Sequence, residues 1–239
     1  MRDPNAVILR KDGDCQATRV DRLRVMMNRR DFLSVCIAAP LGVAMPCVAG
    51  NRIAFRIVRK GSVIGAHTLD FTPRDDGFDV AISIDIAVRF GPIPLYHYRM
   101  RGAEQWRDGA VVFVETTTDD DGKTNSLRCE RDAGGLWVTG SKQPRYRAPA
   151  DALPASHWNI AELNGPWISL QDGRLFHPEV TLRGEEPAVL ADGTTVPTRH
   201  YNLSGDVQLD LWYDGAERWA GLGFTASDGS LIRYERLVT

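Results

Sequence analysis

Apolar side chains occupy every second position of residues 78–90, and this alternation constrains the fold more than any other feature of the chain. Successive side chains of a β-strand point to opposite faces, so a period of two predicts a long strand with one buried face and one polar or small-residue face. Shorter stretches alternate in the same way near 53–57, 63–71 and 207–213. The apolar positions of the long stretch are Phe78, Val80, Ile82, Ile84, Ile86, Val88 and Phe90.

Seven Asp-Gly pairs separate these β-type stretches. Each pair can supply the positive φ angles that a tight hairpin turn requires, so their recurrence predicts an antiparallel meander. A sheet with so many strands must curl or split into two layers, and we therefore expect an all-β fold: a strongly curved sheet, an up-and-down barrel or a two-layer sandwich. The pairs are Asp76-Gly77, Asp108-Gly109, Asp121-Gly122, Asp172-Gly173, Asp192-Gly193, Asp214-Gly215 and Asp228-Gly229.

Residues 150–164 depart from the alternation. Pro154 and the small residues after it precede a run that is compatible with one or two helical turns, which predicts a short helical connection near 154–163. This connection divides the meander into a first half at about 51–148 and a second half at about 166–239. No linker or change in composition accompanies it, so we expect a single β-rich domain over residues 50–239.

The N-terminal part has the features of an export signal. Arg29 and Arg30 are followed by a polar residue and Phe-Leu, which resembles the twin-arginine motif, and the weakly apolar run that follows is shorter than the roughly 20 residues of a bilayer span. Small residues at the −3 and −1 positions predict cleavage between Ala49 and Gly50. Residues 26–49 are therefore interpreted as a signal peptide. The protein is expected to be periplasmic or secreted by the twin-arginine route, with no stable membrane span after cleavage.

Other interpretations of the N-terminal part stay open. The apolar run could form a buried core helix, although Pro40 and Pro46 disfavour a continuous helix. Cys47 could be lipidated, although the residues before it match a lipobox poorly. Residues 1–25 are charged and lack apolar periodicity, so either translation starts at one of the two methionines that follow or these residues form a disordered leader.

Charge and cysteine content narrow the function of the β-rich part. Of the 29 basic and 31 acidic residues of the chain, 21 and 26 lie in residues 50–239, and this acidic balance disfavours nucleic-acid binding. Cys129 is the one cysteine in that region, so an intramolecular disulfide cannot form there and the core must stabilise the domain. Cys129 shares a strand-like face with Leu127, which indicates a core thiol.

No motif for metal binding, cofactor binding or catalysis stands out. The five histidines lack the spacing of a zinc pair, and the acidic run Asp119-Asp120-Asp121-Gly122 lacks the alternating ligands of a calcium loop. Ser156 and His157 are sequence neighbours whose side chains point apart, which argues against a catalytic dyad. We therefore expect no metal and no cofactor, and we assign no catalytic residue. A pair of carboxylates remains possible, so enzymatic activity is left undecided, but no residue pattern favours it.

Tyrosine and tryptophan are spread through the meander, and they suit an amphiphilic ligand because each combines a large apolar surface with a polar tip. The alternative is that these side chains fill the core or cover the sheet edges. A curved sheet leaves a concave face on which such residues can contact a ligand. The candidate ligand-binding residues are Tyr96, Tyr98, Trp106, Trp212 and Tyr213.

Several short elements resemble an exported proteobacterial family of unknown function. The most specific are the Ile-Gly-His element within residues 61–67 and the Trp-Tyr-Asp element at 212–214, and the resemblance extends over about residues 52–236. It implies a signal peptide followed by an antiparallel β-domain. It also implies a likeness in fold to periplasmic proteins whose curved sheets enclose lipid-like ligands, although fold alone does not determine function.

Three functions are compatible with these observations. The favoured hypothesis is a periplasmic protein that binds or carries an apolar or amphiphilic molecule. The first alternative is a structural or assembly factor of the cell envelope that holds a protein partner through a sheet edge or face. The second alternative is a hydrolase of envelope polymers, which requires paired carboxylates or a Ser–His contact.

Overall fold

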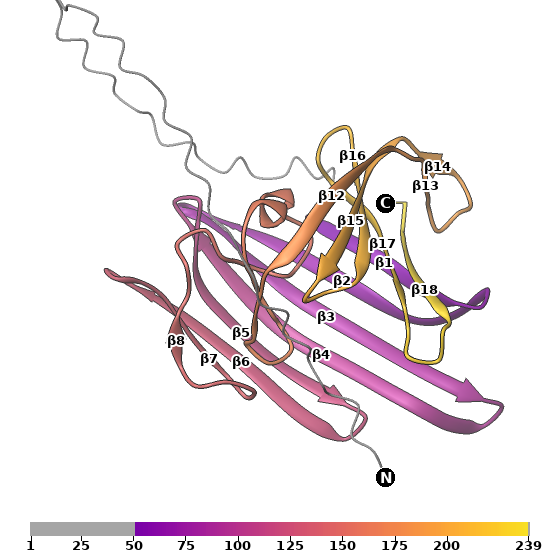
Figure 1. Cartoon of the computed structure of the whole chain (residues 1–239), viewed down its shortest axis with the longest axis horizontal. Coiled ribbons are helices and arrows are strands. Elements are labelled where there is room, and N and C mark those ends of the chain that lie inside the picture. The colour runs from indigo at the N-terminus through magenta and orange to yellow at the C-terminus, as the bar shows by residue number, and fades with distance from the viewer. Residues whose placement is uncertain (1–50, 239) are drawn as a thin grey trace, which may run out of the picture. The chain divides into compact units, whose positions relative to one another are not determined.

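The computed structural model describes residues 51–238, and the predicted signal peptide with Arg29, Arg30 and the Ala49–Gly50 cleavage site lies outside this range. One antiparallel sheet of 13 strands dominates the fold, which confirms the all-β prediction (Figure 1). Its first eight strands follow chain order. They are β1 (Arg52–Arg59), β2 (Ser62–Arg74), β3 (Gly77–Phe90), β4 (Ile93–Arg107), β5 (Ala110–Asp120), β6 (Lys123–Asp132), β7 (Gly135–Gly140) and β8 (Tyr146–Arg147).

The second half of the chain extends the same sheet on the other side of β1. The last strand pairs antiparallel with β1, so that Phe55 lies opposite Arg236, and the sheet order becomes β12-β15-β16-β17-β18-β1-β2 and onward to β8. Within residues 51–238 the end strands β12 and β8 do not pair with each other, so the sheet is rolled without closing into a barrel. The added strands are β12 (Pro178–Glu185), β15 (Thr198–Gly205), β16 (Leu209–Asp214), β17 (Trp219–Thr225) and β18 (Leu231–Arg236).

The predicted Asp-Gly turns form several of the hairpins. Asp108 and Gly109 connect β4 to β5 with φ angles of 49° and 76°, and Asp121 and Gly122 connect β5 to β6 with φ angles of 51° and 84°. Two consecutive positive φ angles define the type I′ turn, whose twist matches that of the strands it joins. These turns explain why the first half of the chain runs as an uninterrupted meander.

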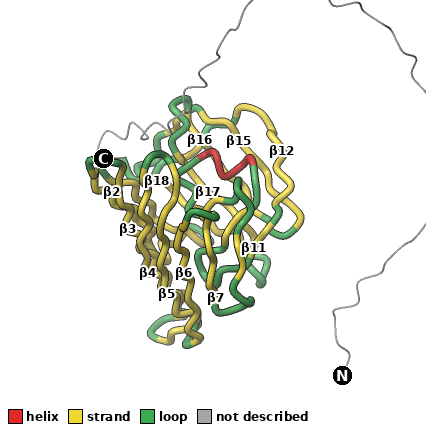
Figure 2. Tube along the Cα trace, turned by 90° about the vertical axis from the view of Figure 1, so that its left-hand side faces the viewer, coloured by secondary structure: helices red, strands yellow, loops and turns green. Residues whose placement is uncertain are grey.

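The connection between the halves, residues 148–177 between β8 and β12, forms an inner segment inside the curve of the sheet (Figure 2). It contains the helix that was predicted near 154–163, found as a 3-10 helix, η1 (Ile160–Asn164). Residues just before this helix instead add β9 (Leu153–Pro154) to a small sheet with β10 (Trp167–Ile168) and β11 (Leu175–Phe176). A further small hairpin is formed by β13 (Ala188–Val189) and β14 (Thr195–Val196).

The core forms where the sheet wraps around this connection. Trp158, just before η1, packs edge-on against Phe71 of β2 at a ring-centroid distance of 5.5 Å. On the other side, Trp219 of β17 contacts Phe55 of β1 at 4.1 Å and is fully buried. The inner segment therefore takes the place of a second sheet layer, because it supplies the apolar side chains that the concave face needs.

Candidate ligand-binding site

The apolar face of β3 extends past the hydrophobic core. Its first alternating residues, from Phe78 to Ile82, are buried in the core cluster. The next three, Ile84, Ile86 and Val88, point to the same face but are only partly buried, and they line a cavity of about 640 Å³. A cavity of this volume lies in the range of about 300–1,000 Å³ that is usual for small-molecule sites.

Strands from both halves of the chain form the walls of this cavity. The first half contributes β3 and the start of β4, including Leu95, and the second half contributes the hairpin of β17 and β18 with Phe224, Ile232 and Tyr234. Most of the lining is aliphatic or aromatic. Leu95 is 59% exposed, which places an apolar side chain at the mouth of the cavity.

At one end of the cavity the lining includes two phenols and an amide, and the carboxylate of Asp120 lies next to them through hydrogen bonds. The Tyr96 hydroxyl donates a hydrogen bond to Asp120 Oδ1 at 2.8 Å, and Gln171 Nε2 donates to Asp120 Oδ2 at 3.4 Å. Tyr98 donates to Gln171 Oε1 at 3.5 Å. Burial raises the pKa of both tyrosines, and the negative charge of Asp120 raises it further, so both hydroxyls stay protonated and can donate.

A second polar group lies at the β1–β2 and β17–β18 turns. Arg59 lines the cavity, donates from Nε to Ser230 Oγ at 2.8 Å and forms an ion pair with Asp228. The hydrogen bonds from Ser230 and the nearby guanidinium of Arg59 hold the pKa of Asp228 well below its usual value. Arg59 is thus already paired within the protein.

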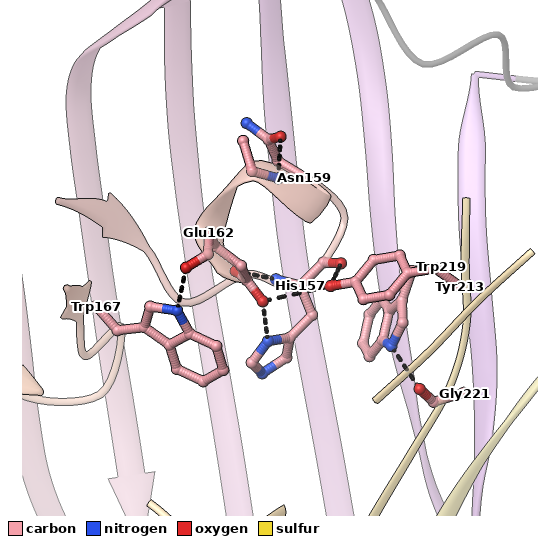
Figure 3. Close-up of polar contacts among 8 residues, drawn as sticks. His157, Asn159, Glu162, Trp167, Tyr213, Trp219 and Gly221 are labelled. Carbon is pink, nitrogen blue, oxygen red and sulfur yellow. Dashed lines mark hydrogen bonds and ion pairs between the residues drawn. The ribbon is translucent and has the colours of Figure 1, made fainter. Parts of the chain in front are cut away.

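A buried polar cluster around Glu162 holds the inner segment in place (Figure 3). The Glu162 carboxylate is inaccessible to solvent and accepts hydrogen bonds from the backbone N–H of His157 at 3.0 Å and from its Nδ1 at 2.7 Å. The Tyr213 hydroxyl donates to the His157 carbonyl at 2.9 Å, and Trp167 Nε1 donates to the Glu162 carbonyl at 2.7 Å. His157 adopts a positive φ of 66°, a conformation that this network keeps in place.

Two further buried ionisable groups lie on the concave face. His67 is 3% exposed among Phe55, Trp219 and Tyr234, and neither ring nitrogen has a hydrogen-bond partner within residues 51–238. Burial lowers the pKa of His67 to about 3, and the nearby His157 contributes to the shift. Glu104 is fully buried and accepts from the indole N–H groups of two tryptophans, while burial raises its pKa.

The predicted ligand-binding residues separate into three groups. Tyr96 and Tyr98 line the cavity. Trp106 and Tyr213 are buried in the core, where Trp106 stacks on a phenylalanine and donates to Glu104, and Tyr213 joins the cluster around Glu162. Trp212 stacks on His200 at 4.6 Å and points away from Tyr213, because neighbours on a strand face opposite sides of the sheet.

Other cavity residues were not predicted. The alternation predicts Ile84, Ile86 and Val88 as part of one buried strand face, and it does not indicate that these three line a cavity. Gln171 and Arg59 come from segments with no local pattern that marks a binding site.

Among the described residues, Ser156 and His157 do not form the Ser–His contact that a nucleophilic hydrolase requires. Ser156 is buried, and its Oγ makes no hydrogen bond to His157. His157 Nδ1 is engaged by Glu162, which orients the ring towards Trp167 and Trp219. The hydrogen bonds of His157 and Glu162 therefore anchor the inner segment to the surrounding strands.

Two further findings concern the described part of the chain. No group of three or more His, Cys, Asp or Glu side chains in residues 51–238 is arranged to hold a metal ion. In the same range no helix is long and apolar enough to cross a membrane.

Comparisons with other proteins identify a similar fold and a family. The fold is similar to that of a β-barrel-like protein of domain of unknown function DUF1849 from Brucella abortus, with a TM-score of 0.53 over 77% of this chain and 94% of that chain. At 11% sequence identity, the likeness concerns the fold alone. No curated protein matches the chain. A family defined by a domain of unknown function, DUF6134, matches residues 55–237, and the chain therefore belongs to the DUF6134 family.

Proposed function

We propose that the domain binds an apolar or amphiphilic small molecule in the cavity between β3, β4 and the β17–β18 hairpin. The observation that carries this proposal is the apolar face of β3, which continues past the core through Ile84, Ile86 and Val88. Partly exposed aliphatic side chains cost free energy in water, at about 25 cal/mol per Å² of apolar surface. A bound chain that covers them recovers this free energy.

The predicted export signal supports a role in the cell envelope. A twin-arginine-type segment at residues 26–49 would deliver the domain to the periplasm or outside the cell, where lipids and other amphiphiles are abundant. We therefore propose an exported binding or carrier protein. The inner segment stabilises the rolled sheet from within, so that the cavity can remain open in the absence of a ligand.

Two measurements test the binding function. Native mass spectrometry of the full chain purified from its own host should detect a co-purified small molecule, and the delipidated protein should take up a fluorescent fatty acid. The substitution Ile86→Trp fills the cavity and should abolish uptake while the protein stays folded. Ala81→Trp is the matched control, because Ala81 lies on the opposite, exposed face of the same strand. Uptake that survives Ile86→Trp would contradict the assignment of this cavity.

A further inference from the structure

The cavity has an aromatic end, and the carboxylate of Asp120 lies next to it, hydrogen-bonded to the Tyr96 hydroxyl. Tyr96 and Tyr98 alternate on β4 and both line the cavity. Asp120 of β5 lies directly opposite Tyr98 in the sheet, so its side chain projects to the same face. Asp120 is half-buried and accepts hydrogen bonds from Tyr96 and Gln171. Its neighbour on β6 is the exposed Lys123, but Asp120 forms no ion pair with this or any other residue in 51–238.

The basic side chains of β4 do not reach this end. Arg99 and Arg101 occupy odd positions, project to the outer face and pair there with Asp85 of β3. His97 contacts the same carboxylate at 3.5 Å. On the inner side, the other charge that acts on Tyr98 is Asp172, whose partner is the exposed Arg174. The charges that act on Tyr96 come from Asp120 and Asp121, and both are negative.

The opposite end of the cavity differs in its charge balance. Arg59 is paired with Asp228 and also bound to Ser230, so a ligand anion would have to compete with an existing carboxylate. Asp120 has no ion-pair partner among residues 51–238. A cation at the Tyr96 end would contact the phenol rings and lie close to this carboxylate, a combination that favours ammonium groups.

We propose that the ligand carries a cationic head group, a primary or quaternary ammonium, which sits against Tyr96 and Tyr98 near the carboxylate of Asp120. Its apolar chain then lies along Ile84, Ile86 and Val88 towards the β17–β18 hairpin. This inference rests on the proposed binding function and specifies the chemistry of the ligand. The aliphatic wall provides affinity for the chain, and the aromatic end with the nearby Asp120 carboxylate selects the charge of the head group.

The test compares ligands that share one chain and differ in head group. Binding of dodecyltrimethylammonium, dodecanoate and dodecanol to the delipidated full chain is measured by calorimetry below their micellar concentrations. The cation should bind at least about tenfold more tightly than the anion, the difference expected for one half-buried ion pair with aromatic contacts. Dodecanol should lie between the two.

Substitutions at and near Asp120 test whether this site causes the preference for the cationic ligand. Asp120→Asn should bring the affinities for cation and anion to within about twofold and leave dodecanol binding unchanged. Asp75→Asn removes the same charge from the exposed β2–β3 turn and should preserve the preference. Tyr96→Leu should weaken cation binding selectively. Thermal unfolding of each variant shows whether the fold is retained.

The outcomes distinguish the two proposals. If dodecanol binds but dodecanoate binds as tightly as the cation, or if Asp120→Asn leaves the preference intact, the head-group inference is wrong and chain binding stands. Tighter binding of dodecanoate would place an anionic head group at Arg59. If none of the three ligands binds, the proposed binding function itself fails, and the head-group inference fails with it.

Discussion

The hydroxyl of Tyr213 donates a hydrogen bond to the backbone carbonyl of His157 at 2.9 Å and thereby ties strand β16 to the segment inside the curved sheet. Both residues belong to elements that the sequence singles out, and 56 positions separate them. Between them lies the buried Glu162 carboxylate, which His157 holds through two hydrogen bonds. The contact thus joins the second half of the meander to the connection between the halves.

This bond predicts a measurable loss of stability in Tyr213→Phe. The substitution removes one buried hydrogen bond and leaves the His157 carbonyl without its donor, which should cost about 1–3 kcal/mol in the free energy of unfolding. Chemical denaturation measures the change. Tyr201→Phe is the matched control, because the Tyr201 ring packs edge-on against Tyr213 but takes no part in the hydrogen bond to His157. Equal effects of the two changes would refute this role of the bond.

Two tryptophans near the end of the sheet should differ in their contribution to stability. Trp219 is fully buried against Phe55, so Trp219→Ala should lower the free energy of unfolding by about 3–5 kcal/mol. Trp212 is only partly buried and stacks on His200 on the opposite face, so Trp212→Ala should cost clearly less. Urea unfolding of both variants checks the order, and a larger loss for Trp212→Ala would contradict it.

The buried His67 predicts a loss of stability in acid. Its folded-state pKa of about 3 lies below the unfolded value near 6.5, so between these values the unfolded chain binds a proton that the folded chain excludes. Stability should therefore fall as the pH decreases from about 6.5 towards 3, by at most about 1.4 kcal/mol per pH unit from this group. Above pH 6.5 both states carry a neutral imidazole and the contribution is constant.

The substitution His67→Phe isolates this effect. Phenylalanine fits among the aromatic neighbours and cannot be protonated, so the variant should lose less stability on acidification than the parent. Glu104 has a raised pKa and contributes with the opposite sign, but it does so in both proteins and cancels in the comparison. Parallel pH profiles for the two proteins would show that His67 does not titrate as described.

Cys129 should be protected from alkylation in the folded protein. Its side chain is fully buried and burial raises the pKa of the thiol to about 12, so the reactive thiolate is nearly absent at neutral pH. Iodoacetamide should label this residue only after denaturation, as read by mass spectrometry of the peptide that contains it. Rapid labelling under native conditions would contradict the burial of Cys129.

The export proposal is tested in cells. Replacing both Arg29 and Arg30 by lysine preserves charge but removes the arginine pair, and the protein should then accumulate as the uncleaved form in the cytoplasm. Fractionation and N-terminal sequencing measure the outcome, and the mature protein is expected to begin at Gly50. Lys60→Arg, an exposed exchange within the domain, should leave export unchanged. Normal export of the double variant would rule out the twin-arginine route.

The strands could be predicted because their causes are local. The alternation of residues 78–90 depends on the opposite orientation of successive side chains, and the positive φ angles at Asp108 and Asp121 depend on the residues of the turn itself. The same alternation could not separate core from cavity, since Ile82 and Ile84 are identical in kind and face the same side. What separates them is burial: Ile82 is 3% exposed in the core, whereas Ile84 is partly buried and lines the cavity, and this depends on segments distant in the sequence.

The sequence by itself determined the all-β class, the hairpin turns and the approximate place of the short helical connection, because each follows from neighbouring residues. The tertiary structure alone decided that β18 pairs with β1, that Tyr96 and Tyr98 reach the cavity while Trp106 and Tyr213 enter the core, and that Asp120 stands beside the two phenols. These features arise from the pairing of distant strands and from the volume of the segment enclosed between them, which local periodicity does not encode.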